Sequence, residues 1–291
     1  MTAPPDAITQ IKVDPFYITG PALVSVSGGR TSGKMLHSIL QAHGGTLPDD
    51  VVACFANTGR EMPATLDFVR DMQASWNVPI VWLEFRHGYA PEAKRRHRWA
   101  EVVSHNSASR NGEPFDMLLE SKKIVPDRSR RFCTEELKVL TIQRYLRDEL
   151  GWTTWQNVVG FRADESVRIE NKRAAEEAEP GRFWSTFPLA NAGVTELDVR
   201  RFWRDQPFDL RLDKDGDGGN CDGCFMFSAE RIGRMFRKYP ERMAWWAEKE
   251  AALGTKTMRP GQSYADIKDI ALNQGVLAWD DASPCHESCG V

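Results

Sequence analysis

The sequence lacks the features that would place the chain in a membrane or on a charged polymer. Its 291 residues carry 38 Lys and Arg against 41 Asp and Glu, so the formal net charge at pH 7 is only −3. A balance this close to zero produces no global basic field that would attract nucleic acid. The longest apolar runs are far too short to span a bilayer, and the polar N-terminus lacks the apolar core of a signal peptide. We therefore expect a cytoplasmic protein without a membrane partner.

Cysteine is also scarce, because six cysteines in a chain of this length are too few for a disulfide scaffold. Two of them, Cys221 and Cys224, form a C-x-x-C. That spacing lets two thiolates bind one metal ion or two corners of a cluster, and it also suits a dithiol redox pair. The cysteine content predicts metal or redox chemistry in a reducing compartment, and Cys54, inside an apolar run, is expected to be an inert core thiol.

The Walker-type phosphate loop G-x-x-x-x-G-K-[ST] is absent, but a different glycine turn is present. An apolar run ends at residues 27–32 (SGGRTS), and a helix-like pattern follows. Glycine lets the backbone approach an anion closely, and the free N–H groups at the start of a helix favour phosphate. The 27–32 turn is therefore a candidate phosphate-binding site.

Apolar runs and helical patterns alternate along the first half of the chain. Strands are expected at residues 23–26, 51–56, 80–85 and 157–161, with helices at 31–42, 64–76 and 134–150. Strands separated by helices favour a parallel sheet with right-handed crossovers, and such sheets bind ligands beyond the carboxyl ends of their strands. We expect an α/β fold, a Rossmann-like parallel sheet flanked by helices, in which the loops at 27–32, 57–61 and 160–168 converge on one crevice.

The chain is expected to divide into three parts. Residues 1–20 form an extended lead-in, residues 21–200 a nucleotide-binding α/β domain, and residues 201–291 a mainly helical, cysteine-bearing region with a mobile tail. Residues 86–130 interrupt the rhythm as a long basic insertion, typical of a lid or binding loop. Its basic run is either a solvated helix face or a clamp for a substrate phosphate or a polynucleotide.

Several of these segments resemble the phosphoadenosine phosphosulfate (PAPS) reductase family, an iron–sulfur type within the PP-loop ATP-pyrophosphatase superfamily. The 27–32 turn looks like the PP-loop. Further similar segments follow in the order of the reductase branch: 55–61 (FANTGRE), 133–138 (CTEELK), 160–168 (GFRADESVR), 187–189 (FPL) with 196–199 (ELDV), and 221–224 (CDGC). The resemblance covers about residues 20 to 230. Thr31 stands where ATP-using members carry Asp, which weakens the case for ATP with magnesium relative to another adenylyl nucleotide.

The resemblance implies a fold of the adenine nucleotide alpha hydrolase type and a bound adenine nucleotide, ATP or PAPS/APS. The residues that it places at this nucleotide are Ser27, Gly28, Gly29, Arg30, Thr31, Ser32, Asn57, Thr58, Gly59, Glu61, Gly160, Arg162, Glu165 and Arg168.

The resemblance also implies a [4Fe–4S] cluster, with zinc as the alternative, since spacing does not separate the two. Its expected ligands are Cys133, Cys221 and Cys224. The fourth ligand is Cys285 or Cys289 in the tail, or the cluster has three cysteine ligands and one open iron. The terminal segment around Cys289 resembles the Glu-Cys-Gly motif of sulfonucleotide reductases, whose cysteine attacks the sulfur of the adenylyl sulfate. Cys289 is therefore the candidate catalytic nucleophile.

Three functions are compatible with these features. The first is reduction of an adenylyl sulfate with a thioredoxin-type reductant. The second is ATP-dependent adenylation and sulfur transfer to a nucleic-acid base, with residues 86–98 as the nucleic-acid contact. The third is a non-catalytic, metal-stabilised nucleotide-binding module. A homodimer is open in each case.

Overall fold

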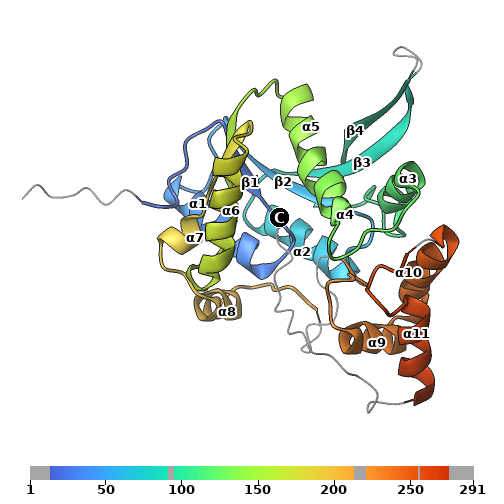
Figure 1. Ribbon diagram of the computed structural model, residues 1–291. Coiled ribbons are helices and arrows are strands. Elements are labelled where there is room, and N and C mark those ends of the chain that lie inside the picture. The colour runs from blue at the N-terminus through green and yellow to red at the C-terminus, as the bar shows by residue number, and fades with distance from the viewer. Residues whose placement is uncertain (1–13, 91–94, 213–220, 255, 275–291) are drawn as a thin grey trace, which may run out of the picture.

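The computed structural model describes residues 14–90, 95–212, 221–254 and 256–274. Its centre is a six-stranded sheet in the order β4-β3-β2-β1-β5-β6 (Figure 1). The strands are β1 Ala22–Ser25, β2 Val51–Asn57, β3 Ile80–Ala90, β4 Arg95–Val103, β5 Trp155–Val158 and β6 Phe183–Thr186. Every neighbouring pair is parallel except the antiparallel pair of β3 and β4. The predicted Rossmann-like α/β fold is confirmed, and the strand order reverses between β1 and β5, the position at which such sheets bind ligands.

Helices connect the strands and cover both faces of the sheet (Figure 1). They are α1 Arg30–Ala42, α2 Pro63–Ser75, α3 Glu113–Lys122, α4 Phe132–Thr134, α5 Leu140–Asp148, α6 Ser166–Ala178, α7 Pro188–Asn191, α8 Glu196–Arg204, α9 Ala229–Lys238, α10 Pro240–Leu253 and α11 Tyr264–Asp269. Short helical turns at Ala163–Glu165, Glu135–Val139 and Ile270–Gln274 complete them, the last two in the π conformation.

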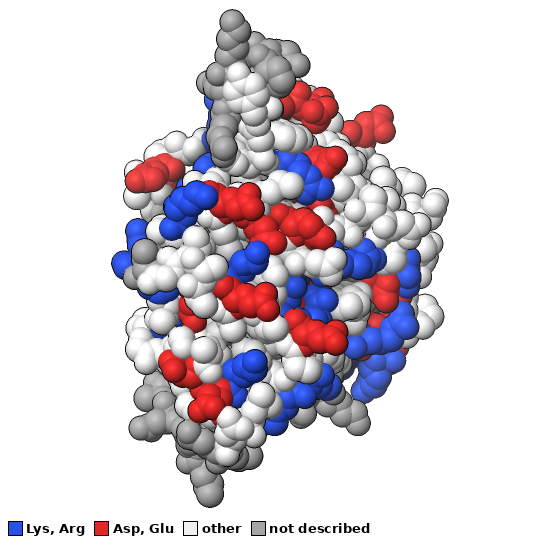
Figure 2. Space-filling view, turned by 90° about the vertical axis from the view of Figure 1, so that its right-hand side faces the viewer, with Lys and Arg blue, Asp and Glu red and all other residues white. Residues whose placement is uncertain are grey.

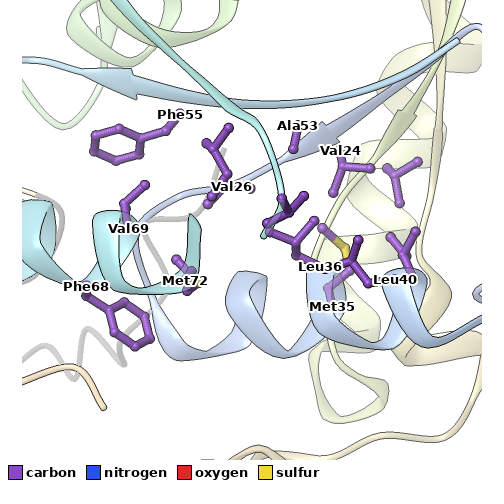
Figure 3. Packing of buried hydrophobic residues seen from close by; sticks show 14 of the residues in the cluster. Val24, Val26, Met35, Leu36, Leu40, Ala53, Phe55, Phe68, Val69 and Met72 are labelled. Atoms are coloured by element: carbon purple, nitrogen blue, oxygen red, sulfur yellow. The ribbon is translucent and has the colours of Figure 1, made fainter. Parts of the chain in front are cut away.

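The strands are buried on both faces, which explains their nearly continuous apolar sequence. Along β1 and β2, Val24 and Phe55 point into the core beneath α1 and α2, whereas Leu23 and Cys54 point to the opposite face. Figure 3 shows Met35 and Leu36 of α1 and Val69 of α2 packed on the first face. Cys54 lies in the opposite core with Ile142 of α5, which confirms the expectation of a buried core thiol.

A second core joins the C-terminal helices to the rest of the chain. Side chains from α9, α10 and α11 pack there with residues of α3 and with Met62, which precedes α2. Phe225, directly after the C-x-x-C, is buried in the same cluster. The C-terminal region is therefore mainly helical, as predicted, and it lies against the loop that follows β2.

Residues 86–130 differ from the expected loop. β3 continues to Ala90 and returns as β4, so the basic run belongs to a β-hairpin and its interpretation as a helix face is wrong. Helix α3 then follows within the same insertion. The expected helix at 134–150 is present, because α4, a π turn at Glu135–Val139 and α5 follow one another without a gap from residue 132 to 148.

The surface carries charges of both signs. On the face shown in Figure 2, Lys and Arg alternate with Asp and Glu over most of the view. Within the residues that the structure describes, no helix is long and apolar enough to cross a bilayer.

Candidate nucleotide and cysteine site

The 27–32 turn joins the carboxyl end of β1 to the start of α1. Gly28 has φ +77°, and a Cβ on it would lie 2.6 Å from Cγ2 of Thr65 on α2. The Ser32 hydroxyl accepts a hydrogen bond from the Ser27 backbone N–H at 3.1 Å and donates to the Gly29 carbonyl at 3.0 Å. No side chain of the described residues caps the first turn of α1, and that turn contains no acidic residue. The predicted glycine turn and helix start are therefore present, and their binding of an anion stays a prediction.

Arg30, within the same turn, points away from it. Its guanidinium forms a two-pronged ion pair with Asp209, at 2.7 and 2.8 Å, and donates to the Leu210 carbonyl at 2.9 Å. The Trp203 indole N–H also donates to the Arg30 carbonyl at 2.7 Å. The structure therefore uses Arg30 to attach the segment after α8 to the start of α1.

The loop after β5 reaches the same turn. A Cβ on Gly160 would lie 3.3 Å from the Ser32 Cα, and Arg162 Nη1 lies 3.5 Å from the Thr31 hydroxyl oxygen. Arg162 also pairs with Asp164 at 2.9 Å. Gly160 and Arg162 thus both lie beside the 27–32 turn. This is expected where the carboxyl ends of neighbouring parallel strands meet.

Glu165 and Arg168 lie one step further out. The Glu165 carboxylate accepts from the Arg162 backbone N–H at 3.0 Å and pairs with the Arg168 guanidinium, which lies over the Phe161 ring at 4.1 Å. These two residues order the loop next to Arg162, and their nucleotide contact stays a prediction.

In the 57–61 loop, Asn57 and Gly59 shape the backbone. The buried Asn57 amide donates to Glu84 at 2.6 Å and to the Ser109 carbonyl at 2.9 Å, and its oxygen accepts from the Gly59 N–H at 3.1 Å. Gly59 has φ +79°, and a Cβ there would lie 2.9 Å from Pro114. Their nucleotide contact also stays a prediction.

Thr58 and Glu61 lie beside a cysteine. The Glu61 carboxylate accepts from the Thr58 N–H at 2.9 Å and from the Thr58 hydroxyl at 2.9 and 3.0 Å. The same hydroxyl lies 3.5 Å from Cys221 Sγ, and the Lys138 ammonium lies 3.7 Å from Glu61. Burial raises the pKa of Glu61, and Lys138 and Thr58 oppose that rise. The loop after β2 thus joins the carboxyl end of this strand to the C-x-x-C.

Two of the three described candidate ligands are neighbours. Burial raises the pKa of the Cys221 thiol, and the nearby Glu61 and Cys133 add to that rise. Burial also raises the pKa of Cys133, against nearby Lys138 and Arg131. Cys224 contributes to the high pKa of the fully buried Tyr264, whose main cause is burial.

The structure does not assemble a complete metal centre from the residues it describes. Within residues 14–90, 95–212, 221–254 and 256–274, no group of three or more His, Cys, Asp or Glu side chains is arranged to hold a metal ion. The predicted fourth ligand Cys285 and the predicted nucleophile Cys289 lie outside the described residues.

Sequence reasoning missed the buried charges around the cysteines. Lys138, Arg60 and Asp222 are all buried, and each contacts the 57–61 loop or lies in it. The usable signal was the position of Asp222 between two cysteines and of Arg60 within the FANTGRE segment. Neither position identifies its partner, because the partners are far apart in sequence.

The chain is an α/β protein with a glycine turn after β1, at the switch point of its sheet. No established protein-family profile matches the chain. The nin region protein ORF290 of Escherichia phage lambda, described as uncharacterized, is 32% identical over 218 residues, which cover 72% of this chain and 68% of that protein. The chain belongs to the family of this phage protein.

A more distant relative is the uncharacterized protein MJ0066 of Methanocaldococcus jannaschii, 22% identical over 278 residues. The match covers 94% of this chain but only 49% of that protein, so this chain spans about half the length of that relative.

Two solved structures show a weak likeness. A phosphoadenylyl-sulfate (PAPS) reductase from Candida auris, in complex with phosphate, has a TM-score of 0.39 and 18% identity over 69% of this chain and 84% of its own. The U34-tRNA thiolase NcsA from Methanococcus maripaludis, with its [4Fe–4S] cluster, has a TM-score of 0.39 and 13% identity over 81% of this chain and 73% of its own. These scores are too low to carry an argument, so the fold assignment rests on the strand order itself.

Proposed function

We propose that this protein is an enzyme of the PP-loop superfamily that binds an adenylyl nucleotide at the 27–32 turn and acts in sulfur chemistry at the cysteines beside it. The observation that carries this proposal is a single contact, the 3.5 Å approach of the Thr58 hydroxyl to Cys221 Sγ. Thr58 directly follows β2, and β2 is the parallel neighbour of β1, which leads into the 27–32 turn. The 27–32 turn and Thr58, which contacts the Cys221 thiol, thus follow adjacent strands at one edge of the sheet.

The phosphates would be bound by backbone N–H groups at the start of α1 and by the hydroxyls of Ser27 and Thr31. Helix starts favour anions through these N–H groups and through the helix dipole. Arg162, within 3.5 Å of Thr31, supplies the nearest cation contact from the loop after β5. A guanidinium there suits a phosphate or sulfate oxygen.

Cys133 and Cys221 are the residues that would hold a [4Fe–4S] cluster, with Cys224 and Cys285 as further ligands. The surroundings fit such a group by charge at Cys133, because nearby Lys138 and Arg131 would offset the negative charge of a bound thiolate. At Cys221, Lys138 acts in the same direction and the Glu61 carboxylate opposes it. If Cys285 is not a ligand, the fourth iron of a bound cluster would be open and would supply a binding position for a sulfur-containing group.

The reaction we favour is that of the resembled reductases. The thiolate of Cys289 attacks the sulfur of an adenylyl sulfate, the S–O bond to the phosphate breaks, and the adenosine phosphate leaves with the electron pair. The resulting S-sulfocysteine is reduced by a dithiol of the thioredoxin type, which becomes a disulfide as sulfite is released. Arg162 and the start of α1 would hold the substrate's phosphate during the attack.

Isothermal titration calorimetry with adenosine phosphosulfate, PAPS and ATP tests the nucleotide site. Gly28→Ala places a Cβ 2.6 Å from Thr65, whereas Gly44, with a similar φ of +70°, has nothing within 4 Å of such a Cβ. We expect wild type and Gly44→Ala to bind one of the nucleotides equally, and Gly28→Ala to bind it at least about tenfold more weakly, a loss of about 1.4 kcal/mol. Equal binding by both variants, or none by the wild type, would refute the site.

The cluster has its own test. Anaerobically purified protein should show a broad band near ~400 nm and about four irons per chain, and Cys221→Ser should lose both. Cys54→Ser is the control, since Cys54 lies in the core of the sheet. One zinc and no colour would leave the cysteines as a structural metal site and remove the cluster from the proposal.

The β3–β4 hairpin favours a second candidate, ATP-dependent sulfur transfer to a nucleic-acid base. Tyr89 and Trp99 on the hairpin are 64% and 37% exposed, and the Trp99 ring stacks on His97 at 4.9 Å. Exposed aromatic rings stack on unpaired bases. However, Arg86 forms ion pairs with Glu84 and Glu101, and Arg98 forms one with Glu136. These carboxylates neutralise the guanidinium groups and so weaken their attraction for phosphates. Pyrophosphate release from ATP that is stimulated by RNA or DNA would favour this candidate; its absence would favour the reductase.

A further inference from the structure

The C-x-x-C encloses a carboxylate that is completely buried. Asp222 stands between the two cysteines, and its carboxylate accepts hydrogen bonds from Arg60 Nη2, Arg242 Nε and Trp246 Nε1, each at 2.7 Å. A buried carboxylate is costly unless it is paired and hydrogen-bonded, and this one has two cations and an indole.

The partners of Asp222 close a ring of contacts around the 57–61 loop. The Asp222 N–H donates to the Arg60 carbonyl at 2.9 Å, and Arg242 Nη2 donates to the Glu61 carbonyl at 2.9 Å. Arg60 Nη2 in turn donates to the Arg242 carbonyl at 2.6 Å. One carboxylate thereby joins three segments, namely the loop after β2, the cysteine turn (residues 221–224) and α10.

The neighbour of Asp222 is fixed in the same way. A Cβ on Gly223 would lie 2.4 Å from the Trp246 ring, so only glycine fits beneath that indole. The Tyr264 hydroxyl donates to the Gly223 carbonyl. Both residues between the cysteines are therefore held by α10 and α11, and the cysteine turn has little freedom to move away from the 57–61 loop.

We propose that Asp222 is a positioning residue: through Arg60 and Arg242 it holds Cys221 against Thr58 and Glu61. The inference rests on the proposed function for the reason why Cys221 is held there. Whether Asp222 holds Cys221 in place can be tested without nucleotide. Loss of the carboxylate leaves two guanidinium groups without their shared partner, and the cysteine turn then opens locally while the sheet stays intact. Local opening of this kind exposes a thiol to reagents.

The experiment is alkylation of the full-length protein by iodoacetamide without added nucleotide, with the rate at each cysteine followed by mass spectrometry. In Asp222→Asn we expect Cys221 to react about tenfold faster than in wild type, with Cys54 unchanged. Cys54 is a control within the same molecule, because a general loss of stability would raise the rates of both thiols together. Glu176→Gln is the control variant, because it also removes a hydrogen-bonded carboxylate. The Glu176 carboxylate accepts from the backbone N–H and the hydroxyl of Ser185 on β6, away from the cysteine turn.

Arg242→Gln keeps the inference testable if Asp222→Asn does not fold. Arg242 is partly exposed and is one of three donors, so we expect a smaller rise at Cys221, about threefold. An unchanged Cys221 rate in the folded variants, or a parallel rise at Cys54, would overturn the positioning role. If the Cys221 rate does not change but nucleotide still binds by calorimetry, the positioning role fails and the proposed function stands. If the Cys221 rate rises as expected but no nucleotide binds, the positioning role stands and the proposed function fails.

Discussion

The two halves of the candidate site are held in place by different forces. The 27–32 turn is shaped by its own residues, since Gly28 adopts a positive φ and the Ser32 hydroxyl contacts Ser27 and Gly29. The cysteine turn is shaped by partners far away in sequence, because Asp222 is fixed by Arg60 and Arg242. The proposed anion site thus depends on short-range geometry, whereas the proposed placement of the Cys221 thiol depends on buried charge pairs. Substitutions in the two halves should therefore destabilise the protein by different amounts and for different physical reasons.

The largest effect should come from Arg60→Met, which breaks the cysteine half. Arg60 is buried, pairs with Asp222 at 2.7 Å and lies over the Trp245 ring. Removing one partner of a buried ion pair costs about 3–5 kcal/mol, and we expect a loss near the lower end because Arg242 still pairs with Asp222. Urea unfolding should show this loss, and a loss below about 1 kcal/mol would mean that the buried pair does not hold the cysteine half.

Gly33→Ala should disturb the nucleotide half by overpacking. A Cβ on Gly33 would lie 2.6 Å from Trp203 and 2.8 Å from the Met72 sulfur. Overpacking costs about 1–3 kcal/mol, and the better helix propensity of alanine returns up to about 1 kcal/mol. We expect a net loss of about 2 kcal/mol in thermal unfolding, with Gly181→Ala, which has open space, unchanged. Equal stability of the two variants would show that the contact between α1 and α8 is loose.

Glu136→Gln tests a charge cluster at the base of the hairpin. Burial opposes ionisation of Glu136, but Lys122, Arg144 and Arg98 outweigh it and hold its pKa below the usual 4.5. A lowered pKa in the folded state stabilises the protein above pH 4.5, and that contribution disappears as the pH falls through the lowered value.

We therefore expect Glu136→Gln to cost about 1–2 kcal/mol at pH 7, between the values for exposed and buried pairs. The difference from wild type should shrink steadily below about pH 4 in urea titrations. A difference that does not depend on pH would assign the effect to packing instead of charge.

The smallest effect should come from Arg30→Gln. The ion pair of Arg30 with Asp209 is substantially exposed, with 41% and 40% of the two side chains accessible. Exposed pairs contribute about 0–1 kcal/mol, so stability should hardly change in the same unfolding assay. A loss above about 2 kcal/mol would show that the Arg30–Asp209 ion pair stabilises the fold as much as the buried ion pairs near the cysteine turn do.

The parts that were predictable from the sequence are those set by short-range patterns. The alternation of apolar strands and helices gave the parallel sheet, and the SGGRTS stretch gave the glycine turn before α1. The hairpin was not predicted, because β3 continues past its buried part into residues such as Arg86 and His87 that carry no strand signal of their own. They are held in the strand by pairing with β4.

The site was predictable only in part for a similar reason. Thr58 and Glu61 were identified as site residues, but their contact with Cys221 and Lys138 depends on how the second core places the C-terminal helices. Arg30 illustrates the converse, since its place in a phosphate-binding motif does not reveal its pairing with Asp209. Such partners are fixed by tertiary packing, which no local pattern encodes.

The measurement that tests the central claim most directly is protection of Cys221 by nucleotide. Iodoacetamide alkylation would be followed at Cys221 and Cys54 with and without a saturating adenine nucleotide, in wild type, Gly44→Ala and Gly28→Ala. If the turn and the thiol form one site, nucleotide should slow alkylation of Cys221 severalfold in wild type and Gly44→Ala, leave Cys54 unchanged and give no protection in Gly28→Ala. Nucleotide that binds by calorimetry but leaves Cys221 equally reactive would show that the two halves are separate sites.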